Sequence, residues 1–387
     1  MPLFASPTTD SALTLRSRNH IAGITGLRSF RRRRAHYQDF GSQIGIFTYG
    51  YTQTLGNGLA FTIAAQDPSP GLRPIVDVGG LAAATAGLAG STFALAPTNN
   101  NNQNAGTLVP DIVASLRVEQ QWGSAQIAGI AHQVRARYWL NAGVDSGGAE
   151  TGIPSLVGFG HPSDKWGWAG MAGLELNLPW AKGDSFAIQG QYCVGASFDC
   201  YNNNGNRLDD TSWNLINVNK IGLGWLDDGF MGNTREIGAH GIDLATNWNV
   251  FAAIQHYWVP EIRTSLYGGY AQYKANSTAV DVEVCQALNS GELHGEGVGS
   301  TGFHGFVSPT GCLDWAAWTI GSRTLWNPVR NLDVGVDVLY ASMSKTAFNG
   351  AVAIVPNAPG TGGTATFNVA DTHIWAGILR VQYNFLP

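Results

Sequence analysis

The sequence predicts an all-β protein, a transmembrane antiparallel up-and-down β-barrel with about eleven readable strands. Three observations predict this class: segments in which apolar and polar residues alternate, connections that are short and long in turn, and a low content of charged residues. Alternation with a period of two is typical of a strand with one apolar and one polar face. In a membrane barrel, lipid contacts the apolar face and water contacts the polar face.

Charged residues make up only 13% of the 387 residues, whereas a soluble protein carries about 25%. The chain is rich in Gly (50) and in aromatic residues, with 13 Trp, 12 Tyr and 16 Phe. Its mean hydropathy is nevertheless close to zero. This combination argues against helical membrane spans and favours a barrel, whose polar inner residues dilute its apolar band.

Each predicted strand is bounded by turn residues. The strands cover 43–54, 58–67, 110–121, 124–138, 166–178, 184–195, 242–256, 261–274, 313–325, 332–342 and 371–385. The last one shows the alternation most clearly, because Trp375, Leu379 and Val381 lie on one side and Arg380 and Gln382 on the other. Most of them have the length that a tilted membrane-crossing strand needs, about 9–11 residues.

The connections between these strands are strictly short and long in turn. The short turns are Leu55–Asn57, Trp122–Gly123, Pro179–Gly183, Tyr257–Pro260 and Trp326–Asn331; the long loops are 68–109, 139–165, 196–241, 275–312 and 343–370. Outer-membrane barrels have short periplasmic turns and longer extracellular loops. The sequence therefore places every short turn on the periplasmic side, together with the end of the last strand.

Four tryptophans, Trp122, Trp180, Trp258 and Trp326, lie at or beside short turns. We expect them to form an aromatic girdle at the periplasmic membrane surface, where such residues are enriched. Packing into a core is the alternative explanation for each of them.

The N-terminal segment, residues 1–38, has a different composition from the rest. It holds seven of the 22 basic residues, including Arg31–Arg34, against the single acidic residue Asp10. Such a run can bind nucleic acid or anionic lipid, but nothing after it favours nucleic-acid binding. We therefore expect a disordered segment, 1–38, ahead of a barrel domain, 39–387. The uncharged stretch Val78–Pro97 is predicted to be a loop, because it is too weakly apolar for a membrane helix.

Two of the four cysteines, Cys285 and Cys312, flank a glycine-rich loop. A disulfide between them is predicted if the protein reaches an oxidising compartment, and two unpaired thiols are the alternative. Cys193 and Cys200 are not predicted to pair. No metal-binding spacing and no G-x-S-x-G, P-loop or HExxH motif is present in the sequence. We therefore expect no cofactor, no metal and no enzymatic activity.

The sequence resembles the alphaproteobacterial porins of the rhizobial and Brucella type. The segments that carry the resemblance are VPDIVASLRVEQQWGSAQIAGIAHQV from Val109, HPSDKWGWAGMAGLELNLP from His161, TSLYGGYAQY from Thr264, GSRTLWNPVRNLDVGVDVLY from Gly321 and LRVQYNF from Leu379. Together they cover about residues 43–387.

The resemblance implies a homotrimer of roughly sixteen-stranded barrels in the outer membrane of a Gram-negative bacterium, in contact with its lipid. It also implies passage of ions and small hydrophilic solutes, and assembly by the barrel-assembly machinery through a terminal aromatic residue, here Phe385. Two departures stand out. The signal peptide, first strands and constriction loop of the family have no counterpart, so the N-terminal part is expected to be lacking. In addition, Leu386 and Pro387 follow Phe385.

A diffusion pore is selective through its width and the charges that line it. Strand parity predicts the following pore-lining residues: Arg117, Glu119, Glu175, Arg263, Arg323, Asp337 and Arg380. Each could instead be a solvated residue without a role in selectivity. The leading hypothesis is a passive diffusion channel. The alternatives are a front-truncated porin that does not conduct and a surface β-barrel that acts through its extracellular loops.

Overall fold

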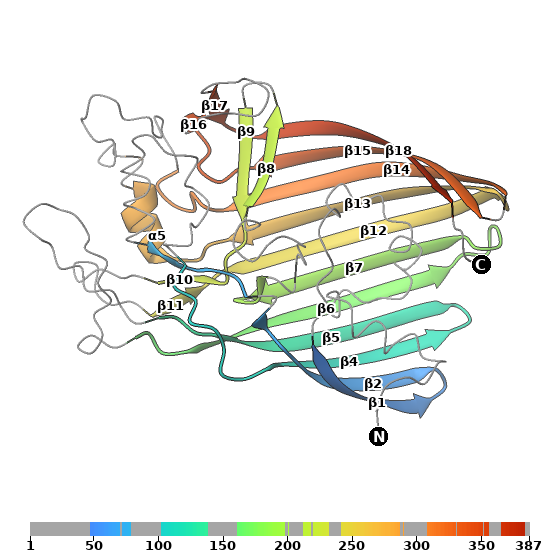
Figure 1. Ribbon diagram of the computed structural model, residues 1–387, viewed down its shortest axis with the longest axis horizontal. Coiled ribbons are helices and arrows are strands. Elements are labelled where there is room, and N and C mark those ends of the chain that lie inside the picture. Colours follow the sequence, from blue (N-terminus) through green and yellow to red (C-terminus); the bar gives the residue numbers. More distant parts are fainter. Residues whose placement is uncertain are drawn as a thin grey trace, which may run out of the picture.

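The computed structural model describes residues 47–69, 72–78, 102–137, 161–197, 200, 212–217, 220–231, 241–286, 289, 308–329, 331–350, 352–355 and 365–383. Eleven long strands form one antiparallel sheet in the order β1-β2-β4-β5-β6-β7-β12-β13-β14-β15-β18 (Figure 1). Each strand between β1 and β18 pairs with the previous and the next long strand along the chain, and β1 and β18 are the edges of the sheet in the described residues. This is the up-and-down topology that the alternation and the loop lengths predict, so the predicted fold class is confirmed.

The bounds of the long strands are β1 Thr48–Gly56, β2 Leu59–Gln66, β4 Asp111–Gln120, β5 Gly123–Val134, β6 Lys165–Asn177, β7 Ser185–Val194, β12 Thr246–Val259, β13 Ile262–Lys274, β14 Trp315–Val329, β15 Leu332–Lys345 and β18 Thr372–Tyr383. All eleven predicted strands are present among them. Two predicted turns are too long, because β12 continues through Tyr257 to Val259 and β14 continues through Trp326 to Val329. Pro260 directly follows β12, and Asn327 and Pro328 lie within the end of β14; such residues are turn signals in a sequence, so the turns were predicted to begin too early.

The tight β1–β2 connection shows why the chain turns where it does. Asn57 and Gly58 have φ angles of 50° and 73°, which the two central residues of a tight hairpin require and which Asn-Gly adopts readily. A Cβ atom at Gly58 would lie 1.9 Å from the carbonyl oxygen of Glu119 on β4. Glycine is therefore required here both by the turn and by the neighbouring strand.

The long connections contain short elements that the sequence pattern does not reveal. They are β3 Ile75–Asp77, β8 Ser212–Asn217, β9 Lys220–Trp225, β10 Gly229–Met231, β11 Ile242–Leu244, α5 Thr278–Val280, the π-helical turn Asp281–Gln286, β16 Val352–Val355 and β17 Ala365–Val369. The short strands among them form two small sheets, β11-β10-β3 and β16-β17-β9-β8, at the long-loop end of the molecule (Figure 1). Residues 79–97 of the stretch 78–97, predicted to be a loop, lie outside the described residues.

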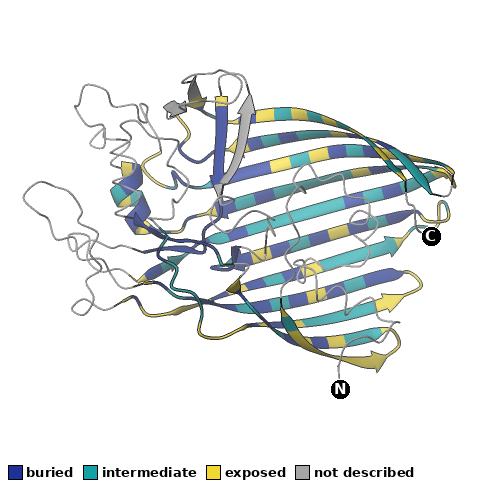
Figure 2. Ribbon diagram, viewed as in Figure 1, coloured by how far each residue is buried: buried dark blue, intermediate teal, exposed yellow. Residues whose placement is uncertain are grey.

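The two faces of the large sheet differ in what covers them. On the inner face, defined here as the face against which the long connections pack, Val76 of β3 and Phe230 of β10 share one buried cluster with Tyr273 of β13 and Trp315 of β14. On the outer face, large apolar side chains are exposed, and exposed and buried positions alternate along the strands (Figure 2). The apolar core of the molecule therefore lies under the long loops, not between two sheets.

Candidate functional site

The candidate site is the inner face at the short-turn end, where charged side chains replace the apolar cluster. On β14 and β15, Arg323 and Asp337 are Cα partners and form an ion pair through Nε–Oδ2 and Nη2–Oδ2 contacts of 2.8 Å each. The hydroxyl of Tyr267 on β13 donates to Oδ1 of Asp337 at 2.5 Å. Both charged side chains are more than 90% buried, so this pair is a fixed part of the wall.

Arg263 lies one strand away and uses a different set of contacts. Its Nη1 donates to Oδ1 of Asn327 at 2.8 Å, and its Nη2 lies 3.8 Å from Oδ1 of Asp333. Its guanidinium also stands over the ring of Tyr257, 5.6 Å from the ring centre. The planar guanidinium therefore contacts an amide, a carboxylate and an aromatic face at once.

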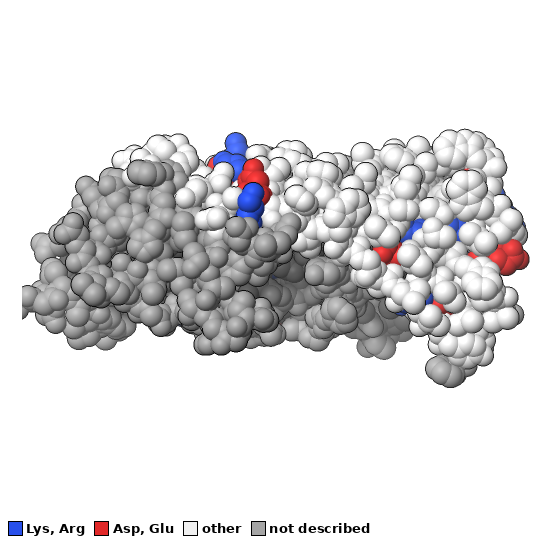
Figure 3. Space-filling view, turned by 90° about the horizontal axis from the view of Figure 1, so that it is seen from above, with Lys and Arg blue, Asp and Glu red and all other residues white. Residues whose placement is uncertain are grey.

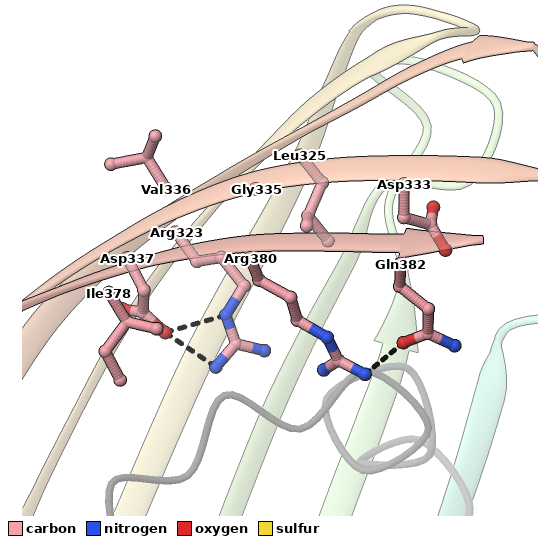
Figure 4. Close-up of a pocket in the computed structure, with 9 residues that line it drawn as sticks. All are labelled: Arg323, Leu325, Asp333, Gly335, Val336, Asp337, Ile378, Arg380 and Gln382. Atoms are coloured by element: carbon pink, nitrogen blue, oxygen red, sulfur yellow. Dashed lines mark hydrogen bonds and ion pairs between the residues drawn. The ribbon is translucent and has the colours of Figure 1, made fainter.

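Arg380 on β18 completes this group of arginines. Its Cα partner is Gly335 on β15, and its guanidinium contacts Oε1 of Gln382. Figure 4 shows Arg323, Arg380 and Gln382 extending to one side of their strands while Val336 extends to the other. A small cavity lies among them, lined by Arg323, Leu325, Asp333, Gly335, Val336, Asp337, Ile378, Arg380 and Gln382.

The other predicted pore-lining residues lie at the opposite side of the sheet. Arg117 and Glu119 on β4 form an ion pair, and Glu175 on β6 is the Cα partner of Ala187 on β7 and of Ser124 on β5. Glu119 is also the Cα partner of Ser124, so the two glutamates flank one serine. All seven predicted residues share the inner face. That they line a pore remains a prediction.

The charges on this face are separated into two groups. Three arginines gather on β13, β14 and β18, next to Asp333 and Asp337, whereas Glu119 and Glu175 lie three to eight strands away in the sheet order. Among the seven predicted residues and Asp333, the first group carries one excess positive charge and the second group carries one excess negative charge. Such a separation produces a field across the inner face.

The outer face carries exposed tryptophans at the short-turn end. Trp122, Trp180, Trp258 and Trp326 are between 45% and 65% exposed. In the view of Figure 3, charged atoms gather at the short-turn end and at one site near the middle, and the described surface between them carries none. The placement agrees with a girdle, whose function remains a prediction.

A second row of aromatic side chains, which the sequence analysis missed, crosses the outer face nearer the long loops. Cα partners on adjacent strands supply three of its steps: Tyr192 with Trp248, Tyr270 with Trp318, and Tyr340 with Trp375. The rings of Trp248 and Tyr270 and of Trp318 and Tyr340 lie 5.1 Å apart and link these steps. The signal was present in the sequence as outward-facing aromatics about eight to ten residues from a predicted short turn, with Trp248 and Trp318 before one and Tyr192, Tyr270 and Tyr340 after one.

The long-loop end of the inner face is covered by the long connections. Two disulfides hold these connections in place, Cys193–Cys200 and Cys285–Cys312, with Cα–Cα distances of 6.1 and 5.5 Å. The first joins β7 to the start of the following loop, so the prediction that Cys193 and Cys200 do not pair is wrong. The second joins the π-helical turn after β13 to the segment before β14. Loop segments thus pack on the inner face although no counterpart of a constriction loop was expected.

Within the described residues, no group of three or more His, Cys, Asp or Glu side chains is arranged to hold a metal ion. No described helix is long and apolar enough to cross a membrane. Residues 1–46 and 384–387 lie outside the described residues, and with them the basic segment 1–38 and Phe385.

A family model described as "Porin subfamily" matches residues 40–378. Among solved structures, the outer membrane channel DcaP of Acinetobacter baumannii is similar at 11% identity and a TM-score of 0.45, over 90% of this chain and 67% of that one. The NanC porin is similar at 5% identity and a TM-score of 0.27, over 88% and 93%. No protein with a curated description matches the chain significantly.

Proposed function

Because the chain belongs to the porin subfamily, whose model matches residues 40–378, we propose that it is an outer-membrane porin that forms a passive channel for ions and small hydrophilic solutes. The family match is the observation that carries this function; the two structural likenesses add no argument to it. Diffusion through a pore requires a wall of suitable width and charge and no catalytic group. The chain is thus a channel protein of the outer membrane of a Gram-negative bacterium.

The orientation follows from the loops. Every short turn lies at one end of the sheet and every long connection at the other, and outer-membrane barrels place short turns in the periplasm. The nine long strands β4, β5, β6, β7, β12, β13, β14, β15 and β18 are 10–15 residues long, long enough to cross a membrane at a tilt. The arginine group therefore lies at the periplasmic end of the path.

The two aromatic rows would then mark the two surfaces of the membrane. On β14, Trp318 and Trp326 both face outward and are eight residues apart, which is about 26 Å along a strand. At a strand tilt of about 35–45° this length rises about 18–21 Å across the membrane, so the two tryptophans lie near the two edges of an apolar band about 25 Å tall. We assign Trp122, Trp180, Trp258 and Trp326 to the periplasmic girdle. The second row of aromatic side chains, which includes Trp318, is assigned to a girdle at the opposite membrane surface.

The seven inner-face charges are proposed to tune which ions pass. The arginine group attracts anions and the glutamates attract cations, so solutes with both signs of charge can orient in the field between them. Buried charges such as Arg323 and Asp337 act mainly by fixing the wall. Of the three arginines in the group, Arg380, which is half-buried at its edge, is the one most able to meet a passing ion, because Arg263 and Arg323 are buried.

Three finer features rest on the resemblance noted from the sequence. They are a place among the alphaproteobacterial porins, a homotrimeric assembly in contact with outer-membrane lipid, and recognition of the terminal strand by the barrel-assembly machinery. The end of β18 at the short-turn side supports the last of these, since Tyr383 pairs with Leu332 beside the β14–β15 turn.

Liposome swelling tests the proposed function. Liposomes that contain the refolded protein should swell in isotonic solutions of small sugars, and the rate should fall steeply as the sugars become larger. Liposomes prepared with heat-denatured protein are the control. Swelling no faster than in this control for the smallest sugar would contradict a diffusion channel.

A further inference from the structure

Two long connections meet over the inner face, at a buried group of charged residues that the channel function does not use. The connection after β2 contributes β3, and the connection after β7 contributes β10, and the two short strands pair in parallel. The amide of Asp228 donates to the carbonyl of Pro74 at 3.0 Å, just before this pairing begins. Residues about 150 positions apart in sequence are thus joined into one covering element.

The carboxylate of Asp228 is the centre of this junction. Its Oδ1 accepts from the amide of Ser197 at 2.7 Å, and its Oδ2 accepts from the amide of Arg73 at 3.3 Å. Oδ2 also lies 3.7 Å from Nε2 of His132 on β5, whose Nδ1 lies 2.8 Å from Oδ1 of Asp111 on β4. Asp228 therefore fixes both connections to each other and to the wall.

The neighbouring carboxyl group, that of Asp227, has a very different environment. Asp227 is 1% exposed, and its Oδ1 has no hydrogen-bond partner among the described residues. Its nearest charged neighbours include a second carboxylate, that of Asp228, and the guanidinium of Arg73. The charged and titratable groups that face this pair are Arg73 before β3, His132 on β5 with Asp111 on β4 behind it, and Tyr273 on β13.

We propose that the element built by β3, β10 and β11 is a gate over the inner face, and that ionisation of Asp227 opens it. A charged carboxylate that is buried beside a second carboxylate, with one oxygen that accepts no hydrogen bond from the described residues, is disfavoured, because burial costs several kcal/mol for an ion. Once ionised, Asp227 is stabilised by water, and water reaches it only when the two connections separate. The protonated carboxyl, by contrast, fits the closed arrangement. The inference concerns regulation of the channel and rests on the proposed function.

The direction of the pH dependence follows from the burial. Burial, and then the charge of Asp228, raise the pKa of Asp227 well above its usual value, although Arg73 opposes this. The closed gate therefore holds the proton more tightly than the open gate does. The closed state is favoured at low pH and is lost as the pH rises through the raised pKa, with at most about a tenfold change in the closed-to-open ratio per pH unit. Acid closes the gate and alkali opens it.

Single-channel recording of the full chain in planar bilayers tests the gate. The wild-type conductance should fall at least about threefold when the pH is lowered from about 8 to about 4.5, given the change in population that one titrating group supports. The variant Asp227→Asn cannot ionise and should keep the low conductance at both pH values. The control is Asp67→Asn, in the same β2–β4 connection, where the carboxylate of Asp67 accepts hydrogen bonds locally from the amide and hydroxyl of Ser69; it should respond like the wild type.

Hydrogen exchange of the same proteins tests the gate without any current. Protection factors for peptides that cover 73–78 and 227–231 should drop at about pH 8 in the wild type but not in Asp227→Asn. Protection of the β12 peptide, 246–259, reports whether each variant is folded. Equal protection of the junction at both pH values, or an Asp227→Asn channel that opens like the wild type, would overturn the gate. If no current is recorded but the protection of the junction still depends on pH, the proposed channel function would be overturned, whereas the pH-dependent closure of the two connections would stand.

Discussion

The ion pair Arg323–Asp337 shows how a single pair of residues can fix the wall of the proposed pore. Each side chain is less than one tenth exposed, so neither is hydrated by bulk water. The attraction offsets the cost of burying two charges only while both partners remain. The hydroxyl of Tyr267 adds a third contact to the same carboxylate. The pair therefore acts as a structural element whose removal is felt through the partner left behind.

Replacing Arg323 by Ala should destabilise the folded barrel by about 3–5 kcal/mol, because Asp337 would remain as a buried charge without its cation. Urea unfolding in liposomes, followed by tryptophan fluorescence, measures the change. The double replacement Arg323→Met with Asp337→Leu removes both charges at similar volume and should recover most of the loss. A double variant as unstable as Arg323→Ala would show that the charge is not the cause.

Arg380→Glu should move the ion selectivity toward cations. The guanidinium stands at the edge of the arginine group, so its replacement by a carboxylate changes the local charge by two elementary charges and makes the local potential more negative. The cation-to-anion permeability ratio, taken from the reversal potential in a salt gradient, should rise roughly two- to fivefold.

A matched control for this change is Lys182→Glu, which reverses a charge in the exposed β6–β7 turn. It alters the net charge of the protein by the same amount outside the inner face. Equal shifts in the two variants would assign the selectivity to net charge and would contradict a role for Arg380 in the pore.

Each long strand presents one face to lipid and one to the path. On β18, Leu379 is 72% exposed near the middle of the outer face and Tyr383 is 51% exposed close to the short-turn end. The apolar residues between the two aromatic rows therefore match the band that lipid tails cover. The cost of a charge on this face depends on its depth in the membrane.

Leu379→Arg should destabilise the protein by about 2–4 kcal/mol, as expected for a cation near the bilayer midplane, whereas Tyr383→Arg should cost only about 0–1 kcal/mol. Unfolding in liposomes of matched thickness measures both. Equal costs for the two variants would mean that this face of β18 is not covered by lipid.

The strands were predictable from the sequence, and the elements of the long loops were not. Alternation along β6 or β15 is local and repeats over 13 or 14 residues, so the pattern alone fixes both the strand and its faces. The pairing of β3 with β10 depends on residues 75–77 and 229–231, each too short for a periodic signal. These two short strands are brought together only when the long loops fold over the inner face.

The candidate site likewise has a part that the sequence predicts and a part that it does not. Parity placed Arg323, Asp337 and Arg380 on one face, because the period of a strand leaves no other choice. Their partners Tyr267 and Gln382 follow from cross-strand register, which a single sequence does not specify. Cys193 and Cys200 were missed for a related reason, since their bridge depends on the path of the loop after β7. Asp227 carries no sequence signal at all.

At the scale of the whole molecule, the two ends of the inner face have different tasks. The long-loop end is packed with apolar side chains under the loops, and the short-turn end carries the charges. Solutes would pass the gate first and the arginine group second. The sheet itself has two edge strands, β1 and β18, in the described residues. A conducting pore requires their backbone groups to be paired, because an unpaired group in lipid costs several kcal/mol.

The central claim is that this chain forms a passive diffusion channel, and planar-bilayer recording at about pH 8 tests it most directly. The refolded full chain should give stable steps of current that are linear in voltage, scale with salt concentration and reflect a water-filled path of fixed width. Protein that inserts into the bilayer, as shown by heat-modifiable migration and protease protection of its strands, yet produces no current at any voltage would contradict the account.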